Sequence, residues 1–185
     1  MAKVYAFLAN GLEEVECLAA CDVLKRAGVE VELVSVNEGK EVVGSHNVHI
    51  ICDSSISEKK DFSDADVLFL PGGMPGTLNL MKCERLTEAL KEQYGNNKRI
   101  AAICAAPSVL GRLGFLEGRK ATCYPGFEDQ LTGAEYTKQG VVTDGNITTA
   151  RGLGYALDLG IELTALLISE DKAKEVKASI QYDQF

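Results

Sequence analysis

Apolar segments of strand length alternate with segments of helical periodicity along most of the chain, which is typical of β-α-β units and a parallel sheet. Four apolar runs predict buried strands, at residues 4–9, 29–36, 66–70 and 99–103. Helical periodicity predicts helices over residues 13–27, 84–94, 155–169 and 171–179. A strand hairpin is predicted around Asp144-Gly145, a favoured two-residue turn. We therefore expect an α/β fold, and because the sequence contains no linker or repeat, one domain over residues 1–185.

After the second predicted strand, residues 42–53 predict an antiparallel excursion at an edge of the sheet. This segment carries both histidines of the chain, His46 and His49, and also Cys52. These residue types bind zinc, but residues three apart on a strand point to opposite faces, and a tetrahedral site needs converging ligands. We therefore expect no metal site.

Composition and charge limit the class of partner and the compartment. Hydrophobic residues make up 46% and charged residues 25% of the 185 residues, as in soluble globular proteins. The net charge of −8 and the pI near 4.9 argue against nucleic acid or an anionic membrane as a partner. The first apolar stretch ends at Ala9 and is too short for a signal peptide, so we expect a cytoplasmic protein whose six cysteines are free thiols.

Cys104 has the clearest chemical signature. It follows the predicted strand 99–103, and Ala105 and Ala106 then lead into a helix. Small residues at such a turn are typical of a nucleophile elbow, which presents a side chain at the carboxyl edge of the sheet. The positive end of the following helix favours a thiolate and predicts a lowered Cys104 pKa. A buried structural cysteine fits the same pattern, because free cysteines are often buried.

A glycine-rich loop favours the reactive interpretation. The strand 66–70 is followed by Pro71-Gly72-Gly73, and consecutive glycines let backbone N–H groups approach an anion closely. If this strand neighbours the cysteine strand, the N–H groups of Gly73 and Ala105 form an oxyanion hole. A plain glycine-rich turn is the alternative.

Glu16 is an acidic residue on an apolar helix face. At 100° per residue it shares that face with Leu12 and Val23, whereas Glu14 lies on the opposite side. A carboxylate in this position is costly unless it is protonated or paired, and burial raises its pKa. Glu13 and Glu14 have a simpler explanation, since acids complement a helix N-terminus.

Four segments of the chain resemble the DJ-1/PfpI (ThiJ) family, in the same order and from end to end. These segments are Gly11–Glu16, Leu70–Gly73, Ala101–Pro107 and Ala150–Gly154. The resemblance implies a flavodoxin-like three-layer sandwich, with a mostly parallel sheet and helices on both faces. It also implies a homodimer, for which Leu18 and Cys21, on the helix face opposite Glu16, offer a modest apolar patch.

The resemblance also implies roles for individual residues. Cys104 matches the reactive cysteine, Glu16 the protonated glutamic acid that hydrogen-bonds its sulfur, and Gly73 and Ala105 the neighbouring backbone donors. Relatives similar to DJ-1 are associated with cofactor-free glyoxalase III and deglycase activities. We therefore expect an enzyme of this type that acts on small methylglyoxal-like aldehydes under oxidative or carbonyl stress. The alternative is a redox-sensing stress or chaperone protein without significant turnover, because a fold alone does not fix function.

One position departs from the family pattern. Relatives often carry a histidine where this chain has Tyr124, and no histidine follows Cys104. The Cys-His pair of a protease is therefore absent from that segment, which disfavours an intracellular peptidase, since an amide leaving group needs a proton donor. A link to thiamine biosynthesis, known for other relatives, is also disfavoured. The sequence leaves the physiological substrate open and predicts structural roles for the other five cysteines.

Overall fold

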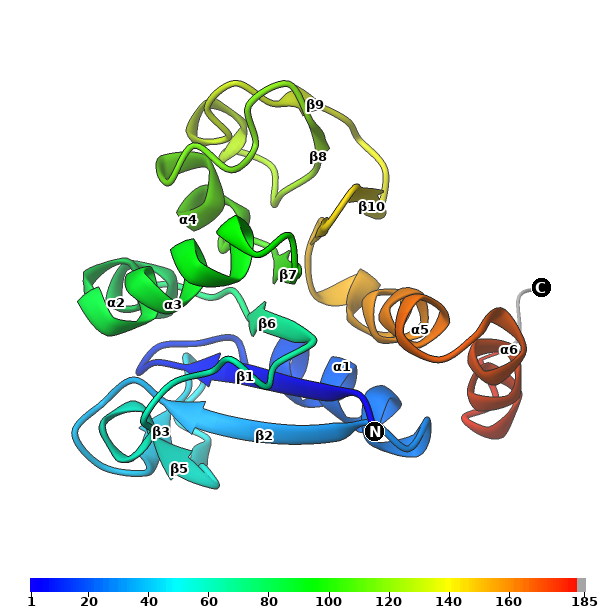
Figure 1. Ribbon diagram of the computed structural model, residues 1–185, viewed down its shortest axis with the longest axis horizontal. Helices are drawn as coiled ribbons and strands as arrows, with labels where there is room; N and C mark the ends of the chain where they lie inside the picture. The colour runs from blue at the N-terminus through cyan, green and yellow to red at the C-terminus, as the bar shows by residue number, and fades with distance from the viewer. Residues whose placement is uncertain (183–185) are drawn as a thin grey trace.

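The computed structural model, which describes residues 1–182, is built around a seven-stranded sheet (Figure 1). Its strands are β1 (Lys3–Leu8), β2 (Glu30–Ser35), β5 (Ser54–Ser55), β6 (Val67–Leu70), β7 (Arg99–Ile103), β10 (Val141–Asp144) and β11 (Ile147–Ala150). They lie in the order β10-β11-β7-β6-β1-β2-β5. All neighbouring strands are parallel except β10, which is antiparallel to β11.

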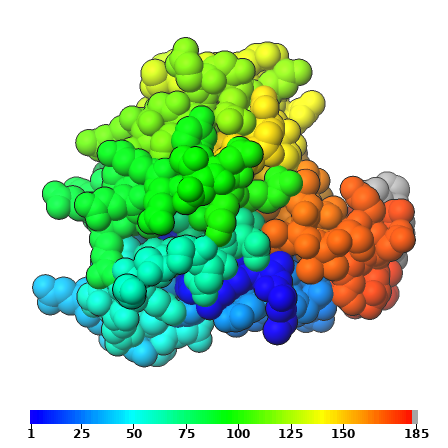
Figure 2. Space-filling view, in the orientation of Figure 1, coloured from blue at the N-terminus to red at the C-terminus, as the bar shows by residue number. Residues whose placement is uncertain are grey.

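Helices cover both faces of this sheet. One side carries α1 (Glu14–Arg26), which packs against α5 (Ala156–Leu167), and α5 packs in turn against α6 (Glu170–Ser179). The other side carries α2 (Gly76–Lys82), α3 (Glu84–Gly95) and α4 (Pro107–Arg112). The described residues also form the short 3₁₀ turns η1 (Ile56–Glu58), η2 (Glu128–Gln130) and η3 (Leu153–Tyr155). Figure 2 shows α6, in red, projecting from one side of the molecule beyond α5. Within residues 1–182, no helix combines the length and the apolar character needed to cross a membrane.

Two apolar cores lie between the sheet and the helices. Along β1, Ala6 and Leu8 enter the core beneath α1 and α5, whereas Tyr5 and Phe7 enter the core beneath α3 and α4. This alternation follows from the two-residue period of a strand, and it requires both faces of β1 to be apolar. The mostly parallel sheet with helices on both faces is the flavodoxin-like sandwich expected from the resemblance.

The strands and helices predicted from periodicity are present, with bounds shifted by at most two residues. The predicted hairpin is also present, but Asp144 pairs with Ile147, so its turn is Gly145-Asn146, one residue later than expected. Gly145 has a φ of +60°, the left-handed conformation that glycine adopts without strain. Helix α2 and the two-residue strands β8 (Lys120–Ala121) and β9 (Glu135–Tyr136) were not predicted, because each is too short to show a period.

The segment after β2 differs from its expected position. Strands β3 (Glu41–Val43) and β4 (His49–Ile51) form an antiparallel pair of their own, and β5 is the edge of the main sheet. We call residues 41–51 the β3–β4 hairpin. Its backbone bonds to the chain before α1: the Gly11 N–H donates to the Val43 carbonyl oxygen, and the Ser45 N–H to that of Leu12, both at 2.8 Å. The hairpin therefore covers the start of α1.

The strand order determines where a site can form. The chain proceeds from β1 to β2 and β5 on one side, and then returns to place β6 on the other side of β1. Open α/β sheets bind ligands at such a reversal, beyond the carboxyl ends of the strands. The segments that follow β1, β6 and β7 meet there, and they contain Glu16, Gly72 and Cys104.

Candidate active site

Cys104 occupies a strained turn between β7 and α4. Its φ is +64°, in the left-handed region, which costs a residue other than glycine about 1–2 kcal/mol. Two backbone hydrogen bonds maintain this conformation: the Cys104 N–H donates to the Ala150 carbonyl at 2.9 Å, and the Tyr124 N–H donates to the Cys104 carbonyl at 2.8 Å. The turn leaves the thiol half-buried at the carboxyl edge of the sheet.

The loop after β6 packs so closely against this turn that it requires glycine. A Cβ atom added to Gly72 would lie 2.6 Å from the Cβ of Cys104 and 2.6 Å from Oε2 of Glu16. A Cβ atom added to Gly73, whose φ is +89°, would collide with the backbone nitrogen of Glu13. The two glycines thus let the loop fit between the start of α1 and the cysteine turn.

This close approach brings backbone donors to the sulfur. The N–H groups of Gly73 and Ala105 both hydrogen-bond to Cys104. They are the two donors named from the sequence, and the prediction depended on β6 and β7 being neighbours, which they are. Two N–H groups from different strands therefore converge on one point beside the thiol.

Glu16 lies beneath the thiol, on α1. Its side chain is 1% exposed, as expected from its position on an apolar helix face. Its Oε2 accepts a hydrogen bond from the Gly72 N–H at 3.1 Å, and its carboxyl is also hydrogen-bonded to the Cys104 thiol and to the Leu153 N–H. Burial raises the pKa of Glu16 to about 7, and the hydrogen bonds from Cys104 and Gly72 oppose that rise.

The predicted lowering of the Cys104 pKa is wrong for this structure. Burial raises the pKa of the thiol to about 12, with further increases from the negative charge of Glu16 and its hydrogen bond. The N–H groups of Gly73 and Ala105 lower it, but by less. The sequence argument relied on the dipole of the following helix, but α4 has only six residues, and it left out burial of the sulfur.

Cys104 and Glu16 form a coupled acid–base pair. The charge of Glu16 raises the Cys104 pKa only while Glu16 is ionised, so this contribution disappears when the proton is on the carboxyl. Such a pair titrates as one unit, because each group changes the pKa of the other. The same proton can lie on the sulfur, with Glu16 as acceptor, or on Glu16, with the thiolate as acceptor.

Sequence reasoning missed two contributors to the site. The Gly72 N–H binds Glu16, although only Gly73 was expected to donate. The segment from Ala150 to Leu153 supplies the carbonyl that fixes Cys104 and an N–H for Glu16. This segment is one of the four that resemble the family, but it contributes through backbone groups, which the residue types in the sequence do not indicate.

Tyr124 takes the place at which relatives often carry histidine. Its side chain is exposed, and a Cβ atom on Gly152 would lie 3.3 Å from its ring. Both histidine rings bond elsewhere: Nδ1 of His46 lies 3.1 Å from Oε2 of Glu14, and Nδ1 of His49 lies 2.6 Å from Oε1 of Glu41. Within residues 1–182, therefore, no histidine side chain is hydrogen-bonded to the Cys104 thiol.

Glu14 is buried, contrary to the helical-wheel expectation, because the β3–β4 hairpin covers that side of α1. Its Oε1 accepts from the His46 N–H at 2.8 Å, and its Oε2 lies 3.3 Å from the Ser45 hydroxyl. Burial opposes ionisation, but hydrogen bonds from backbone N–H groups and from His46 lower the pKa of Glu14 to about 2. Gly44 has no side chain that would displace this carboxylate.

The histidines and Cys52 do not converge into a metal site. His46 and His49 bind different carboxylates, and Cys52 is buried in the core beneath α1. A different group, Glu13, Glu14 and His46, brings one potential ligand atom from each residue within 4.8 Å of the others. The carboxylates of that group already accept hydrogen bonds from α1 and the hairpin, which account for their arrangement.

The remaining cysteines are free thiols, and Cys21 corrects the predicted dimer patch. Cys21 is buried in the core beneath α1 and α5 and hydrogen-bonded to Cys17, whereas Leu18 is exposed. Other exposed apolar side chains of α1 and the β3–β4 hairpin are Val15 on the helix and Val48 and Ile51 on the hairpin.

Comparison with known proteins relates nearly the whole chain to one group of proteins. The model of the DJ-1/PfpI family matches residues 2–166. Protein DJ-1 homolog B of Arabidopsis thaliana is 37% identical over 180 residues, which are 96% of this chain and 41% of that protein. The Parkinson disease protein 7 homolog of Danio rerio is 34% identical over 96% of both chains. The chain thus spans less than half the length of the two Arabidopsis relatives and nearly all of the fish protein.

Solved structures give the same relationship. Toxoplasma gondii DJ-1, in an oxidized form, superposes with a TM-score of 0.95 at 34% identity over the full length of both chains. Drosophila melanogaster DJ-1beta superposes with a TM-score of 0.93 at 35% identity over 97% of both chains.

Proposed function

Since this chain belongs to the DJ-1/PfpI family, we propose that it is a cysteine-dependent, cofactor-free enzyme of the glyoxalase III or deglycase type. Its substrates are methylglyoxal-like aldehydes, and its role is in oxidative or carbonyl stress. The observation that carries the proposal is the pairing of Cys104 with the buried carboxyl of Glu16, beside the N–H groups of Gly73 and Ala105.

The first step is addition of the sulfur to the aldehyde carbon. Glu16 accepts the thiol proton as the carbon–sulfur bond forms, and the carbonyl π electrons move onto oxygen to give a hemithioacetal. A base with a pKa of about 7 suits this task, because it is partly ionised at neutral pH and returns the proton readily. The N–H groups of Gly73 and Ala105 stabilise the negative charge that develops on oxygen.

The second step moves hydrogen within the substrate. Glu16, again ionised after protonating the oxygen, removes the proton from the former aldehyde carbon, and the electrons of that C–H bond move toward the neighbouring carbonyl oxygen to give an enediolate. Glu16 then returns this proton to the neighbouring carbon, and the hydroxyl proton of the former aldehyde carbon passes to the neighbouring oxygen. The product is an acyl thioester on Cys104, so one carbon is oxidised while its neighbour is reduced. Water then hydrolyses the thioester and restores the thiol, and methylglyoxal leaves as lactate. A deglycase reaction uses the same hemithioacetal chemistry on early glycation adducts.

Turnover tests this proposal directly. Purified protein incubated with methylglyoxal is expected to produce lactate without added cofactor, and Cys104→Ser is expected to abolish the activity. Glu16→Gln keeps a hydrogen-bond donor but cannot exchange a proton, so the rate is expected to fall by about 10²–10⁴. Activity of Glu16→Gln equal to that of the unmodified protein would place the proton transfer on another group, with Tyr124 as the next residue to replace.

A redox-sensing role is the second candidate function, and one observation favours it. Cys104 is half-buried rather than buried, and N–H groups surround its sulfur that can bind added oxygens. The similar Toxoplasma gondii protein has been solved in an oxidized form. On this proposal, mild peroxide adds two oxygens to Cys104 before any other cysteine, as sulfinate. Peptide mass mapping with Cys17 or Cys123 oxidised first, or rapid lactate formation by the reduced protein, would count against a sensor without turnover.

Assembly and location complete the proposal. We propose a cytoplasmic homodimer that contacts through α1 and the β3–β4 hairpin, where Val15, Leu18, Val48 and Ile51 are exposed. An apolar group of this kind on two adjacent elements is typical of a contact surface.

A further inference from the structure

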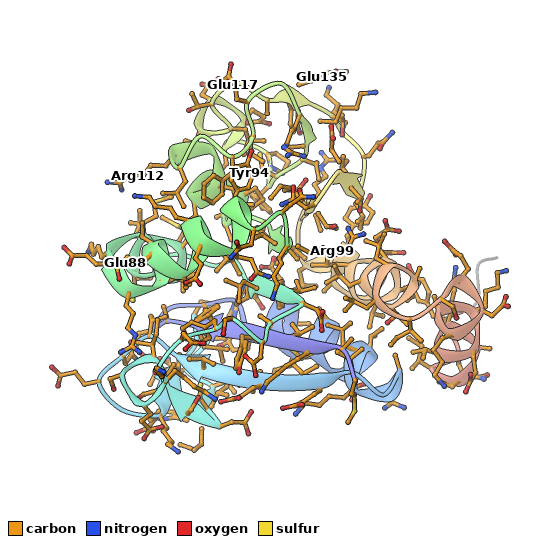
Figure 3. All side chains as sticks on the ribbon, viewed as in Figure 1. Glu88, Tyr94, Arg99, Arg112, Glu117 and Glu135 are labelled. Carbon is orange, nitrogen blue, oxygen red and sulfur yellow. The ribbon has the colours of Figure 1, made fainter. Side chains whose placement is uncertain are left out.

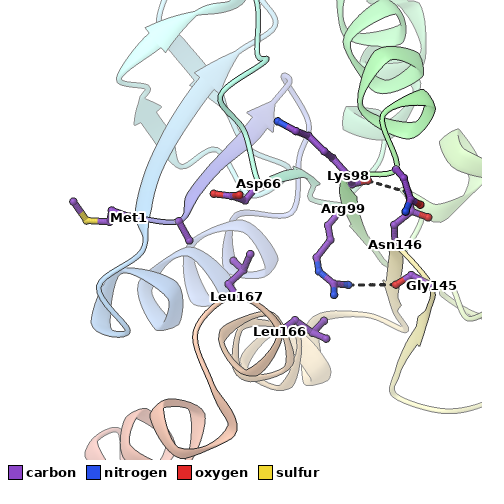
Figure 4. Close-up of a pocket in the computed structure, with 10 residues that line it drawn as sticks. Met1, Asp66, Lys98, Arg99, Gly145, Asn146, Leu166 and Leu167 are labelled. Atoms are coloured by element: carbon purple, nitrogen blue, oxygen red, sulfur yellow. Dashed lines mark hydrogen bonds between the residues drawn. The ribbon is translucent and has the colours of Figure 1, made fainter.

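A pocket of about 670 Å³ lies at the amino ends of the strands, at the edge of the sheet opposite Cys104 (Figure 4). Its volume is within the range of small-molecule sites. Arg99 begins β7 and lines this pocket, whereas Cys104 follows the end of the same strand. At about 3.3 Å per residue, the two Cα atoms are about 17 Å apart, so the pocket is separate from the proposed reaction site.

Arg99 brings a positive charge that no acidic residue within residues 1–182 neutralises. Its one hydrogen bond runs from Nη1 to the Gly145 carbonyl at 3.3 Å, drawn in Figure 4. The guanidinium keeps N–H donors in the fork geometry that binds carboxylates at two points.

Asp66 brings a negative charge to the same pocket. It directly precedes β6, and because Val67 pairs with Arg99, the acid and the arginine lie on neighbouring strands. Its Oδ2 accepts a hydrogen bond from the Lys3 backbone N–H at 2.8 Å, and no side-chain cation of the described residues pairs with it. Lys98, another cation that lines the pocket besides the ammonium group of Met1, donates its side-chain hydrogens to the carbonyls of Ser63 and Ala65.

The floor of the pocket adds an apolar surface. Leu166 and Leu167, at the end of α5, are half-buried and line the pocket below Arg99 in the view of Figure 4. A ligand confined there meets a guanidinium, a carboxylate and two leucine side chains. A simple anion would be repelled by Asp66 and a simple cation by Arg99, whereas a molecule with both charges satisfies both residues.

We propose that this pocket binds a free α-amino acid with an apolar side chain. The ligand carboxylate pairs with Arg99, its ammonium group pairs with Asp66, and its side chain lies against Leu166 and Leu167. This site is independent of the chemistry at Cys104.

The test is a titration of the full chain, followed by the shifts of its backbone amide resonances. L-leucine is expected to give saturable shifts around Gly145 and Asn146. Leucinamide lacks the carboxylate, and 4-methylpentanoate lacks the ammonium group. Each is expected to bind at least about tenfold more weakly than L-leucine, because one charge-assisted pair is lost.

Two variants and a matched control locate the binding. Arg99→Gln and Asp66→Asn are each expected to weaken L-leucine binding about tenfold or more, while circular dichroism reports whether the variant is folded. Arg112→Gln, at an exposed arginine elsewhere on the surface (Figure 3), is expected to bind like the unmodified protein. Absence of saturation up to about 10 mM, shifts centred on Gly72 and Gly73, or unchanged binding by both folded variants would overturn the proposal.

Discussion

Glu16 and Cys104 both have raised pKa values because both are withdrawn from water. The charge of Glu16 raises the Cys104 pKa further, whereas the hydrogen bond from Cys104 lowers the Glu16 pKa. Burial is the largest cause of both increases, and it raises the pKa of the carboxyl to about 7 and that of the thiol to about 12. Backbone N–H groups oppose this effect, those of Gly73 and Ala105 at Cys104 and that of Gly72 at Glu16, because a hydrogen bond to the ionised form lowers the pKa. The reactivity of the sulfur therefore depends on where the shared proton lies.

Replacing Glu16 with glutamine is expected to lower the Cys104 pKa. The change removes the negative charge that raises this pKa and leaves an N–H donor for the thiolate. A lower pKa means more thiolate at a given pH, so alkylation by iodoacetamide at pH 8 is expected to be faster in Glu16→Gln than in the unmodified protein. Glu88→Gln, on the surface of α3, serves as the control. Equal or slower alkylation in Glu16→Gln would show that its charge does not set the Cys104 pKa.

Replacing Gly72 with alanine is expected to disrupt the pair without removing either member. The added methyl group would lie 2.6 Å from both Cys104 Cβ and Glu16 Oε2, so one of them must move. A misplacement of this size is expected to lower any aldehyde turnover about 10²-fold. Gly95→Ala is the matched control, because nothing lies within 4 Å of its added Cβ. Full activity of Gly72→Ala would show that the contact is not needed.

At the scale of secondary-structure elements, the start of α1 is fixed by the β3–β4 hairpin. Periodicity predicted the helix and the buried face of Glu16 correctly, because those depend on α1 itself. It placed Glu14 and Cys21 on the exposed side, but the hairpin covers Glu14, and Cys21 is buried in the core beneath α1 and α5. No local pattern predicts that covering, since it arises from hydrogen bonds between residues more than thirty positions apart, such as Gly11 with Val43.

Glu14 is expected to stabilise the fold in a pH-dependent way. Its pKa in the folded protein, about 2, is below the ordinary 4.5, so its contribution is complete above about pH 4.5 and is lost as the pH falls through about 2. Glu14→Gln is expected to lower the free energy of unfolding in urea at pH 7, by on the order of 3 kcal/mol. The difference should shrink strongly near pH 2.5. A loss of the same size at both pH values would assign the effect to packing instead.

At the scale of the whole molecule, the alternation of strands and helices predicts the sheet and both helical layers, because a parallel sheet must be covered on each face. The alternation of strands and helices along the chain does not predict the order of the strands in the sheet. That order determines that the turns after β1, β6 and β7 meet, and the expected convergence of Gly73 and Ala105 was conditional on it. Leu18 remains exposed, and the exposed apolar residues of the hairpin, Val48 and Ile51, could not be found from the periodicity of one helix.

A role for these exposed residues in the proposed dimer is testable. Light scattering is expected to give twice the chain mass at micromolar concentration, and Leu18→Glu is expected to give a monomer, because it places a charge in an apolar contact. Leu78→Glu alters an equally exposed leucine on α2 and is expected to leave the dimer intact. A single chain mass for the unmodified protein, or a dimer unaffected by Leu18→Glu, would contradict this arrangement.

The positive φ of Cys104 has a consequence for how this sequence can evolve. Glycine adopts that conformation without the steric cost that a cysteine carries, so Cys104→Gly removes strain along with the thiol. Selection for a durable fold alone would favour the replacement, and only selection for the sulfur opposes it. Descendants of this protein that have lost the need for the thiol should therefore drift toward glycine at position 104. Gly72 stays constrained even then, because an added Cβ would still lie 2.8 Å from the backbone oxygen of Ile103.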